Sequence, residues 1–174
     1  MKDLSLHIMD IVQNSITAGS DTITVSLDKN SEELLLQIQD NGKGMSKETI
    51  KRVTDPYYTS RTTRKVGLGI PLLKQNAERT NGTFNIQSEI NVGTTTSAKF
   101  IHTNIDMLPL GDIGGVISLC MSSNPDINFI FKFKTNDDIF EISTNDIKEV
   151  LEDVPISDPQ VISYIKNIIN ENIN

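Results

Sequence analysis

An acidic, glycine-containing turn directly after an apolar run is the feature that most constrains this chain. Residues 34–38 (Leu-Leu-Leu-Gln-Ile) predict a buried strand, and the turn Asp40–Met45 follows at once. Gly42 and Gly44 tolerate positive φ and let the backbone approach a flat ligand closely. A carboxylate at the end of a buried strand is costly unless a group donates to it. The amine of an adenine could donate such a bond to Asp40, worth about 1.5–3 kcal/mol; an ordinary Asx-Gly turn is the alternative interpretation.

Residues 2–18 predict an amphipathic helix with two distinct faces. Asn14 offers an oxygen to a magnesium ion that keeps most of its waters. Asp10, one turn earlier, could accept a proton from a water that attacks a terminal phosphate. The alternative is a merely solvated face, and His7 could equally be a packing residue. The apolar face is formed by Leu4, Ile8, Ile11, Val12 and Ile16, and the polar one by His7, Asp10 and Asn14.

A basic segment leads into a second predicted helix, which runs to about Thr80. Pro71 suits a first helical turn, which places Gly67, Leu68 and Gly69 at the helix entry. Free N–H groups and the positive end of the helix dipole bind anions at such a position. Because the chain has a net charge of −7, a local excess of bases favours a phosphate-bearing ligand. Residues 56–77 contain no acid and four bases: Arg61, Arg64, Lys65 and Lys74.

Two further strands are expected at residues 83–88 and 94–100, because polar and apolar or β-branched residues alternate there. A turn at residues 91–93 joins them. Thr94 opens the second strand and is the natural candidate to share the edge of an adenine with Asp40.

Four blocks therefore follow one another within residues 1–101: an Asn on the first helix, Asp-x-Gly-x-Gly after a strand, Gly-Leu-Gly before a helix, and Gly-Thr at the start of a strand. This order resembles the GHKL (Bergerat-fold) superfamily of gyrase, heat-shock protein 90, mismatch-repair and histidine-kinase ATPases. The resemblance implies an α/β two-layer sandwich, with a mixed, mostly antiparallel sheet and helices on one face. It also implies ATP and Mg²⁺ as cofactors.

The resemblance assigns roles to individual residues. It implies that Asn14 binds Mg²⁺ and that Asp40 binds the amine of adenine. The base is lined by Gly42, Gly44 and Met45, with Thr94 beside it. Phosphates are held beneath a mobile lid at residues 46–66, by Gly67, Leu68 and Gly69, with Arg64 or Lys65 offsetting their charge.

One departure concerns hydrolysis. Hydrolysing members place a Glu four residues before the Asn, where this chain has the shorter Asp10. A base displaced by roughly 1 Å can cost about a hundredfold in rate. We therefore expect ATP binding with slow or conditional hydrolysis, and Asp10 is the candidate catalytic residue.

A closer resemblance concerns residues 10–16 and 59–69 and extends through residues 109–112. The sequence of these segments is similar to that of the stand-alone ATP-binding proteins associated with iron-only hydrogenases in anaerobic bacteria. It implies a nucleotide-dependent switch acting on an unidentified protein partner, with a hydrogenase-related protein as one candidate and a homodimer as another possibility. No dimerising hairpin with a phospho-accepting His is expected. The alternatives are a protein serine/threonine kinase resembling the anti-sigma-factor kinases and a non-hydrolysing adaptor.

The charge balance predicts a boundary near residue 103. Residues 1–101 carry 12 Lys/Arg against 11 Asp/Glu, whereas residues 102–174 carry 4 against 12. The acidic part argues against nucleic-acid binding. We expect an ATP-binding domain at 1–103 and a small α+β domain at 104–174 that serves as a docking module. The second domain should contain a helix capped by Asp112, a hairpin, and two helices, the last capped by Ser157 and running to Ile169.

Composition excludes several other classes. No apolar run is long enough to span a bilayer and no leader pattern opens the chain, so we expect no membrane partner and a cytoplasmic location. The single Cys120 lies in an apolar run and is expected to be buried, and there is no Cys/His cluster for a structural metal.

Overall fold

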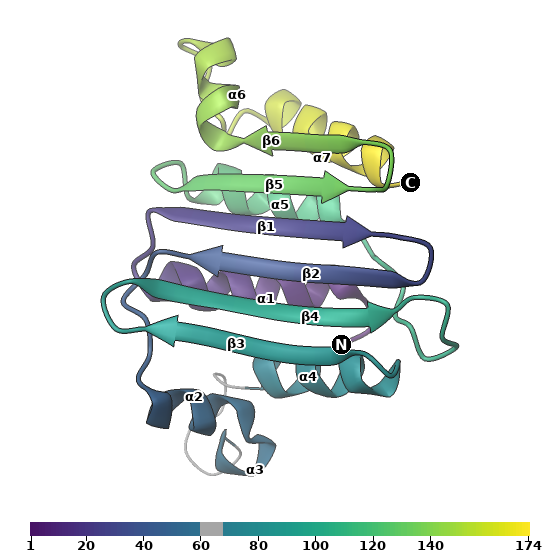
Figure 1. The fold of residues 1–174 in the computed structure, drawn as a ribbon. Helices are drawn as coiled ribbons and strands as arrows, with labels where there is room; N and C mark the ends of the chain where they lie inside the picture. Colours follow the sequence, from purple (N-terminus) through teal and green to yellow (C-terminus); the bar gives the residue numbers. More distant parts are fainter. Residues whose placement is uncertain (60–67) are drawn as a thin grey trace.

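The computed structural model of this chain describes residues 1–59 and 68–174. They form one six-stranded sheet in the order β3-β4-β2-β1-β5-β6 (Figure 1). All neighbouring strands are antiparallel except β1 and β5, which are parallel. The strands are β1 (Thr22–Lys29), β2 (Glu33–Asp40), β3 (Thr83–Glu89), β4 (Gly93–Ile101), β5 (Asn128–Lys134) and β6 (Ile139–Ser143).

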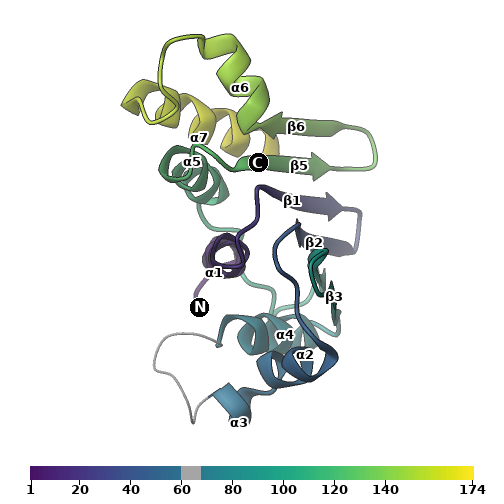
Figure 2. The same cartoon turned by 90° about the vertical axis from the view of Figure 1, so that its left-hand side faces the viewer.

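The described helices cover one face of this sheet and leave the other face open (Figure 2). The predicted α/β two-layer sandwich with a mixed, mostly antiparallel sheet is therefore confirmed. The helices are α1 (Leu4–Thr17), α2 (Lys47–Thr54), α3 (Pro56–Thr59), α4 (Gly69–Arg79), α5 (Ile113–Ser123), α6 (Thr144–Leu151) and α7 (Pro159–Ile173).

The core lies between the helices and the sheet, and the residue pattern explains its position. Strand β2 buries alternate residues, so Leu34, Leu36 and Ile38 face the helices. Helix α1 buries a helical stripe that includes Leu4 and Ile8, both fully covered. Burying a side chain of this size contributes roughly 1.5–3 kcal/mol, which holds α1 firmly against the sheet.

Strand register brings polar residues together at one end of the sheet. Asp40 ends β2 and is the Cα partner of Thr94 on β4, which is in turn the partner of Ser88 on β3. Three adjacent strands therefore present a carboxylate and two hydroxyls side by side.

The C-terminal part continues the same sheet across the predicted boundary near residue 103. Strand β5 pairs with β1 over seven residue positions, from Thr22↔Asn128 to Asp28↔Lys134. The linker is also tied to the first helix, because the N–H of Leu4 donates to the carbonyl of Pro109 at 2.9 Å. The division into domains at 1–103 and 104–174 stays a prediction.

Local details of the C-terminal part confirm one predicted cap and correct another. The Asp112 carboxylate accepts from the N–H of Gly115 and caps α5, as expected. The last helix is capped by Asp158 rather than Ser157, because the Asp158 carboxylate accepts from the N–H of Gln160 and Pro159 takes the first helical position. It runs to Ile173, four residues beyond the predicted end. Cys120 is buried, as predicted.

Two short helices lie inside the segment that the sequence identifies as a lid, and they were not predicted. Helix α2 is capped by Ser46, whose hydroxyl accepts from the N–H of Thr49, and α3 follows at once.

Among the described residues, no helix is long and apolar enough to cross a membrane.

Candidate functional site

A cavity of about 310 Å³ lies between α1 and the sheet, on the helix-covered face. One of its walls is apolar and suits a flat ring: Ile11, Met45, Val53, Ile70 and Ile86. Its polar groups come from α1, the end of β2, the turn after β2 and strand β4, and include Asp10, Asn14, Ser15, Asp40, Lys43, Thr94 and Thr96. Six of the predicted site residues line this single cavity: Asp10, Asn14, Asp40, Gly44, Met45 and Thr94.

The Asp40 carboxylate is fixed by three donors. The Ser15 hydroxyl donates to Oδ2 at 2.6 Å, while the N–H groups of Gly42 and Thr94 donate to Oδ1 at 2.9 and 3.3 Å. These bonds compensate for placing a carboxylate at the end of a buried strand. A carboxylate oxygen accepts more than one hydrogen bond, so the anchored group can still accept one from a ligand in the cavity.

Close backbone approach shapes this end of the cavity. Gly44 has φ +69°, and a Cβ there would overlap the carbonyl group of Glu89. Gly93 has φ +141°, and a Cβ there would overlap the carbonyl group of Asp40. Gly42 packs against Ala18 and does not itself line the cavity. The turn after β2 therefore lies directly against the β3–β4 turn, where side chains would hold the two apart.

Asp10 and the start of α4 are in direct proximity. A Cβ built on Gly69 would overlap the Asp10 carboxylate, so the first residue of α4 sits on that side chain. Burial raises the pKa of the Asp10 carboxyl above its ordinary value. A carboxylate with a raised pKa is a better proton acceptor.

The remaining predicted residues divide into two groups. Leu68 is 57 % exposed and stands at the N-cap of α4, where no side chain caps the helix. The first N–H groups of α4 are therefore available to an anion. Arg64, Lys65 and Gly67 lie outside the described residues.

His7 does not belong to the solvated polar seam that its spacing with Asp10 and Asn14 suggested. It is fully buried, and one of its ring nitrogens, Nε2, lies 2.8 Å from the side-chain nitrogen of Asn76 on α4. The packing interpretation was the correct one. The bond joins α1 to α4, the two helices that carry Asp10 and Gly69.

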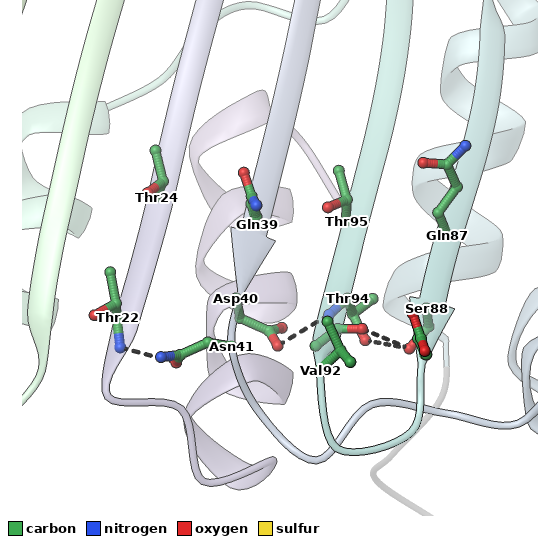
Figure 3. A pocket seen from close by; sticks show the side chains of 12 residues that line it. Thr22, Thr24, Gln39, Asp40, Asn41, Gln87, Ser88, Val92, Thr94 and Thr95 are labelled. Carbon is green, nitrogen blue, oxygen red and sulfur yellow. Dashed lines mark hydrogen bonds between the residues drawn. The ribbon is translucent and has the colours of Figure 1, made fainter.

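Sequence reasoning missed two hydroxyls in the site, Ser15 and Ser88. Ser15 anchors Asp40, and Ser88 lies 2.7 Å from the hydroxyl of Thr94 (Figure 3). Each falls on the side of its element that packs toward the core: Ser15 is four residues after the buried Ile11, and Ser88 is two residues after the partly buried Ile86. A hydroxyl on such a face needs a partner, and this is the signal that could have identified both.

A second, open hollow of about 580 Å³ lies around the same strand ends and extends over the other face of the sheet (Figure 3). Asp40 and Thr94 contribute to both. Its other side chains are mainly hydroxyl and amide groups, such as Thr24, Gln39 and Gln87, and its lining contains no Lys or Arg. It offers neither an apolar wall nor a basic group, so the helix-side cavity suits a nucleotide better.

Across residues 1–59 and 68–174, no group of three His, Cys, Asp or Glu side chains could hold a metal ion. A magnesium ion bound through one protein oxygen and phosphates needs no such group.

Comparison with known families matches residues 2–104 to the model of the histidine kinase-, DNA gyrase B- and HSP90-like ATPases. The match covers more than half of the chain. The chain belongs to this family of ATPases. The GHKL resemblance drawn from four short motifs is thereby confirmed at the level of the family.

The curated relatives include two kinases of Bacillus subtilis (strain 168). Sensor histidine kinase YxdK is 32 % identical over 107 residues, which cover 58 % of this chain and 33 % of that protein. Sporulation kinase B is 30 % identical over 99 residues, which cover 55 % of this chain and 23 % of that protein. This chain thus spans a third or less of the length of these relatives.

Two solved structures share the fold. The N-terminal domain of a DNA repair protein has a TM-score of 0.61 at 16 % identity, covering 82 % of this chain and 52 % of that one. The Aquifex aeolicus MutL ATPase domain complexed with ADP has a TM-score of 0.57 at 15 % identity, covering 87 % of this chain and 70 % of that one. Both similarities cover more of the chain than residues 2–104, so they include part of the C-terminal segment.

Proposed function

We propose that this ATPase-family domain binds ATP with Mg²⁺, hydrolyses it slowly or conditionally, and acts as a nucleotide-dependent switch on a protein partner. The observation that carries the proposal is that Asp40 and Asp10 line one cavity, the first anchored by Ser15 and the second beside Gly69. Ser15 and Asp10 are five residues apart on α1, about 7.5 Å along the helix. The cavity thus offers a base-reading carboxylate and, farther along the same helix, a separate carboxylate near an anion-binding helix start.

The residues fit an adenine at the β2 end of the cavity. The exocyclic amine would donate to Asp40, and the ring would lie against the apolar wall that includes Met45 and Ile86. Guanine carries an oxygen in place of that amine, and an oxygen facing a carboxylate is repelled. ATP should therefore bind more tightly than GTP.

The residues also fit the phosphates and a magnesium ion. Asn14 lines the cavity one turn after Asp10, and its side-chain oxygen is a ligand type that Mg²⁺ accepts. When bound, the ion would neutralise phosphate charge. The uncapped start of α4, with Leu68 and Gly69, would hold phosphate oxygens through backbone N–H groups. For Arg64, Lys65 and Gly67, the proposed contact with the phosphates is supported by the sequence alone.

Asp10 is the proposed proton acceptor for the attacking water. Its pKa is raised by burial, which favours proton transfer, whereas its short side chain limits its reach. Slow turnover is the expected balance of these two effects.

The switch function is proposed from the position of α2. Val53 of this helix lines the cavity, so a bound nucleotide would contact the segment that the sequence identifies as a lid. A ligand that contacts one arrangement of a segment shifts the population toward it. The C-terminal part is the proposed docking module, and a hydrogenase-related protein stays a predicted partner.

Calorimetric titration with ATP and GTP, with and without Mg²⁺, tests the proposed function. We expect ATP to bind more tightly than GTP and Mg²⁺ to strengthen binding. Asp40→Asn should weaken ATP binding at least tenfold. Equal affinity for both nucleotides, or unchanged affinity in Asp40→Asn, would contradict the adenine assignment.

Transfer of the phosphoryl group to a protein is the second candidate activity, favoured by the kinase names of the relatives. Incubation with ATP labelled on the terminal phosphate separates the two. Label on a protein indicates a kinase, whereas free labelled phosphate indicates hydrolysis. If Asp10→Asn changes neither, Asp10 has no catalytic role. If the unaltered protein gives neither product, a non-hydrolysing adaptor is favoured.

A further inference from the structure

Ser88 lies next to the proposed nucleotide cavity and belongs to none of the four sequence motifs. Its hydroxyl oxygen lies 2.7 Å from the N–H of Met45, 3.0 Å from the carbonyl oxygen of Gly93 and 2.7 Å from the hydroxyl of Thr94. Met45 and Thr94 both line the cavity, whereas Ser88 lines the open hollow on the other side of Thr94 (Figure 3). Ser88 therefore contacts two residues of the site from behind.

The Ser88 hydroxyl has one hydrogen to donate, and this limits the network to two arrangements. The N–H of Met45 can only donate, so it always occupies one lone pair of Ser88. In the first arrangement Ser88 donates to the Gly93 carbonyl, and Thr94 donates to Ser88. In the second arrangement Ser88 donates to Thr94 instead, and the Gly93 carbonyl loses the hydrogen bond from Ser88.

These arrangements give the Thr94 hydroxyl opposite polarity toward the cavity. When Thr94 donates to Ser88, only its lone pairs are left for a ligand. When Thr94 accepts from Ser88, its own hydrogen is free to point at a ligand. The direction of the hydrogen bond between Ser88 and Thr94 thus decides whether the Thr94 hydroxyl accepts from a ligand or donates to it.

The position of Thr94 relative to Asp40 identifies the ligand atom concerned. Their Cα atoms are partners in the β2–β4 ladder, and the N–H of Thr94 donates to Asp40 Oδ1 at 3.3 Å. On adenine, the ring nitrogen N1 is adjacent to the carbon that bears the amine. The other ring acceptor beside the amine is N7, on the opposite side. With the amine on Asp40 and N1 turned toward β4, N1 is an acceptor that requires a donor.

We infer that Ser88 is a positioning and specificity-determining residue: it donates to Thr94 and so directs the Thr94 hydroxyl hydrogen toward N1 of adenine. The inference rests on the proposed ATP binding and deepens it. A chain of two hydrogen bonds pointing the same way polarises both of them. Ser88 therefore strengthens the N1 contact without touching the nucleotide.

The test is a cycle that combines one protein change with one ligand change. Calorimetry measures ATP and 1-deaza-ATP, in which N1 is replaced by C–H, against the complete chain and the Ser88→Ala variant. In the unaltered protein, loss of N1 should weaken binding about five- to tenfold. In Ser88→Ala, replacing N1 by C–H should weaken binding only about twofold or less, because the hydrogen bond to N1 is already weakened in this variant.

Two further variants serve as controls. Ser88→Thr keeps the hydroxyl and suits a strand, so it should restore the discrimination between the two nucleotides. Ser97→Ala removes a serine hydroxyl on the open face of β4, away from the cavity, and should leave the discrimination unchanged. Thermal unfolding of each variant shows how far the strand itself is affected.

The outcomes separate this inference from the proposed function. If Ser88→Ala weakens both nucleotides by the same factor, Ser88 only supports the turn and the inference is overturned. If the unaltered protein binds 1-deaza-ATP as tightly as ATP, there is no N1 contact and the inference fails, while ATP binding stands. If ATP itself produces no binding heat, the proposed function fails first.

Discussion

The Asp10 carboxylate on α1 lies against Gly69, the first residue of α4, so closely that the space holds no additional carbon atom. This relationship connects two of the sequence motifs, the polar side of the first helix and the Gly-Leu-Gly segment. It also gives a reason for a glycine at position 69 that does not involve a positive φ, because any larger residue would displace the Asp10 carboxylate.

Gly69→Ala should impair turnover more than binding or folding. The overlapping atoms are at the end of the Asp10 side chain, which can rotate away, and Ala is favoured over Gly in a helix by roughly 0.5–1 kcal/mol. We therefore expect a change in thermal stability below about 1 kcal/mol. The displaced carboxylate should lower the rate of phosphate release about tenfold or more, measured at saturating ATP.

The matched control is the same change in an Asp10→Asn background. If Gly69→Ala acts by moving Asp10, it should add little to the effect of Asp10→Asn, because both remove the same proton acceptor. Fully additive losses would show that Gly69→Ala acts elsewhere, on the phosphate-binding N–H groups for example.

Ser15→Ala should weaken ATP binding about three- to tenfold. It removes the 2.6 Å hydrogen bond to Asp40 Oδ2, while the N–H groups of Gly42 and Thr94 still hold Oδ1. The carboxylate then loses part of its orientation and must be ordered by the ligand. Calorimetry with ATP measures the effect, and Ser26→Ala on the open face of β1 is the control. Equal affinity of Ser15→Ala and the unaltered protein would mean that Asp40 needs no anchor.

Most of the fold and the grouping of the main site residues followed from local patterns. The apolar run at residues 34–38 predicted a strand, which is β2, and helical spacing in α1 predicted which face of that helix is buried; the structure agrees with both. Asp40 and Thr94 were expected to share one ligand edge, and they are partners in adjacent strands. These features depend on residues close together in sequence or on motifs of fixed order.

The features that sequence reasoning missed depend on contacts between distant segments. The parallel pairing of β1 with β5 joins residues about 100 positions apart, and no local pattern specifies it. Ser88 gains its importance only when the β3–β4 turn meets Met45. His7 is fully buried because α4 covers it, whereas its spacing alone suggested a solvated face.

Buried His7 should make stability depend on pH between about 6.5 and 4. Burial lowers its pKa from 6.5 to about 4, so the unfolded chain binds a proton in this range that the folded protein does not. The stabilising contribution is complete above pH 6.5 and decreases as pH falls to about 4, by about 3 kcal/mol in total. Asp10, whose pKa is raised, acts with the opposite sign.

Comparison of the unaltered protein with His7→Gln isolates this contribution, because Asp10 is present in both. Urea unfolding at pH 7.5, 6, 5 and 4.5 should show a smaller fall in the free energy of unfolding for His7→Gln. The matched control is His102→Gln, which removes the other histidine of the chain, near Asn30. An unchanged slope in His7→Gln would assign the pH dependence to other groups.

Phe131→Leu should test whether the sheet unfolds as one unit across the predicted boundary at residue 103. Phe131 is fully buried on β5, and its Cα partner is Val25 on β1. The smaller side chain should cost about 1–2 kcal/mol. Because β1 and β5 share one ladder, we expect a single unfolding transition that moves as a whole, both with and without ATP. Ile139→Ala on β6, where the side chain is 64 % exposed, should have little effect. Two separate transitions, only one of which responds to ATP, would instead support two independent domains at 1–103 and 104–174.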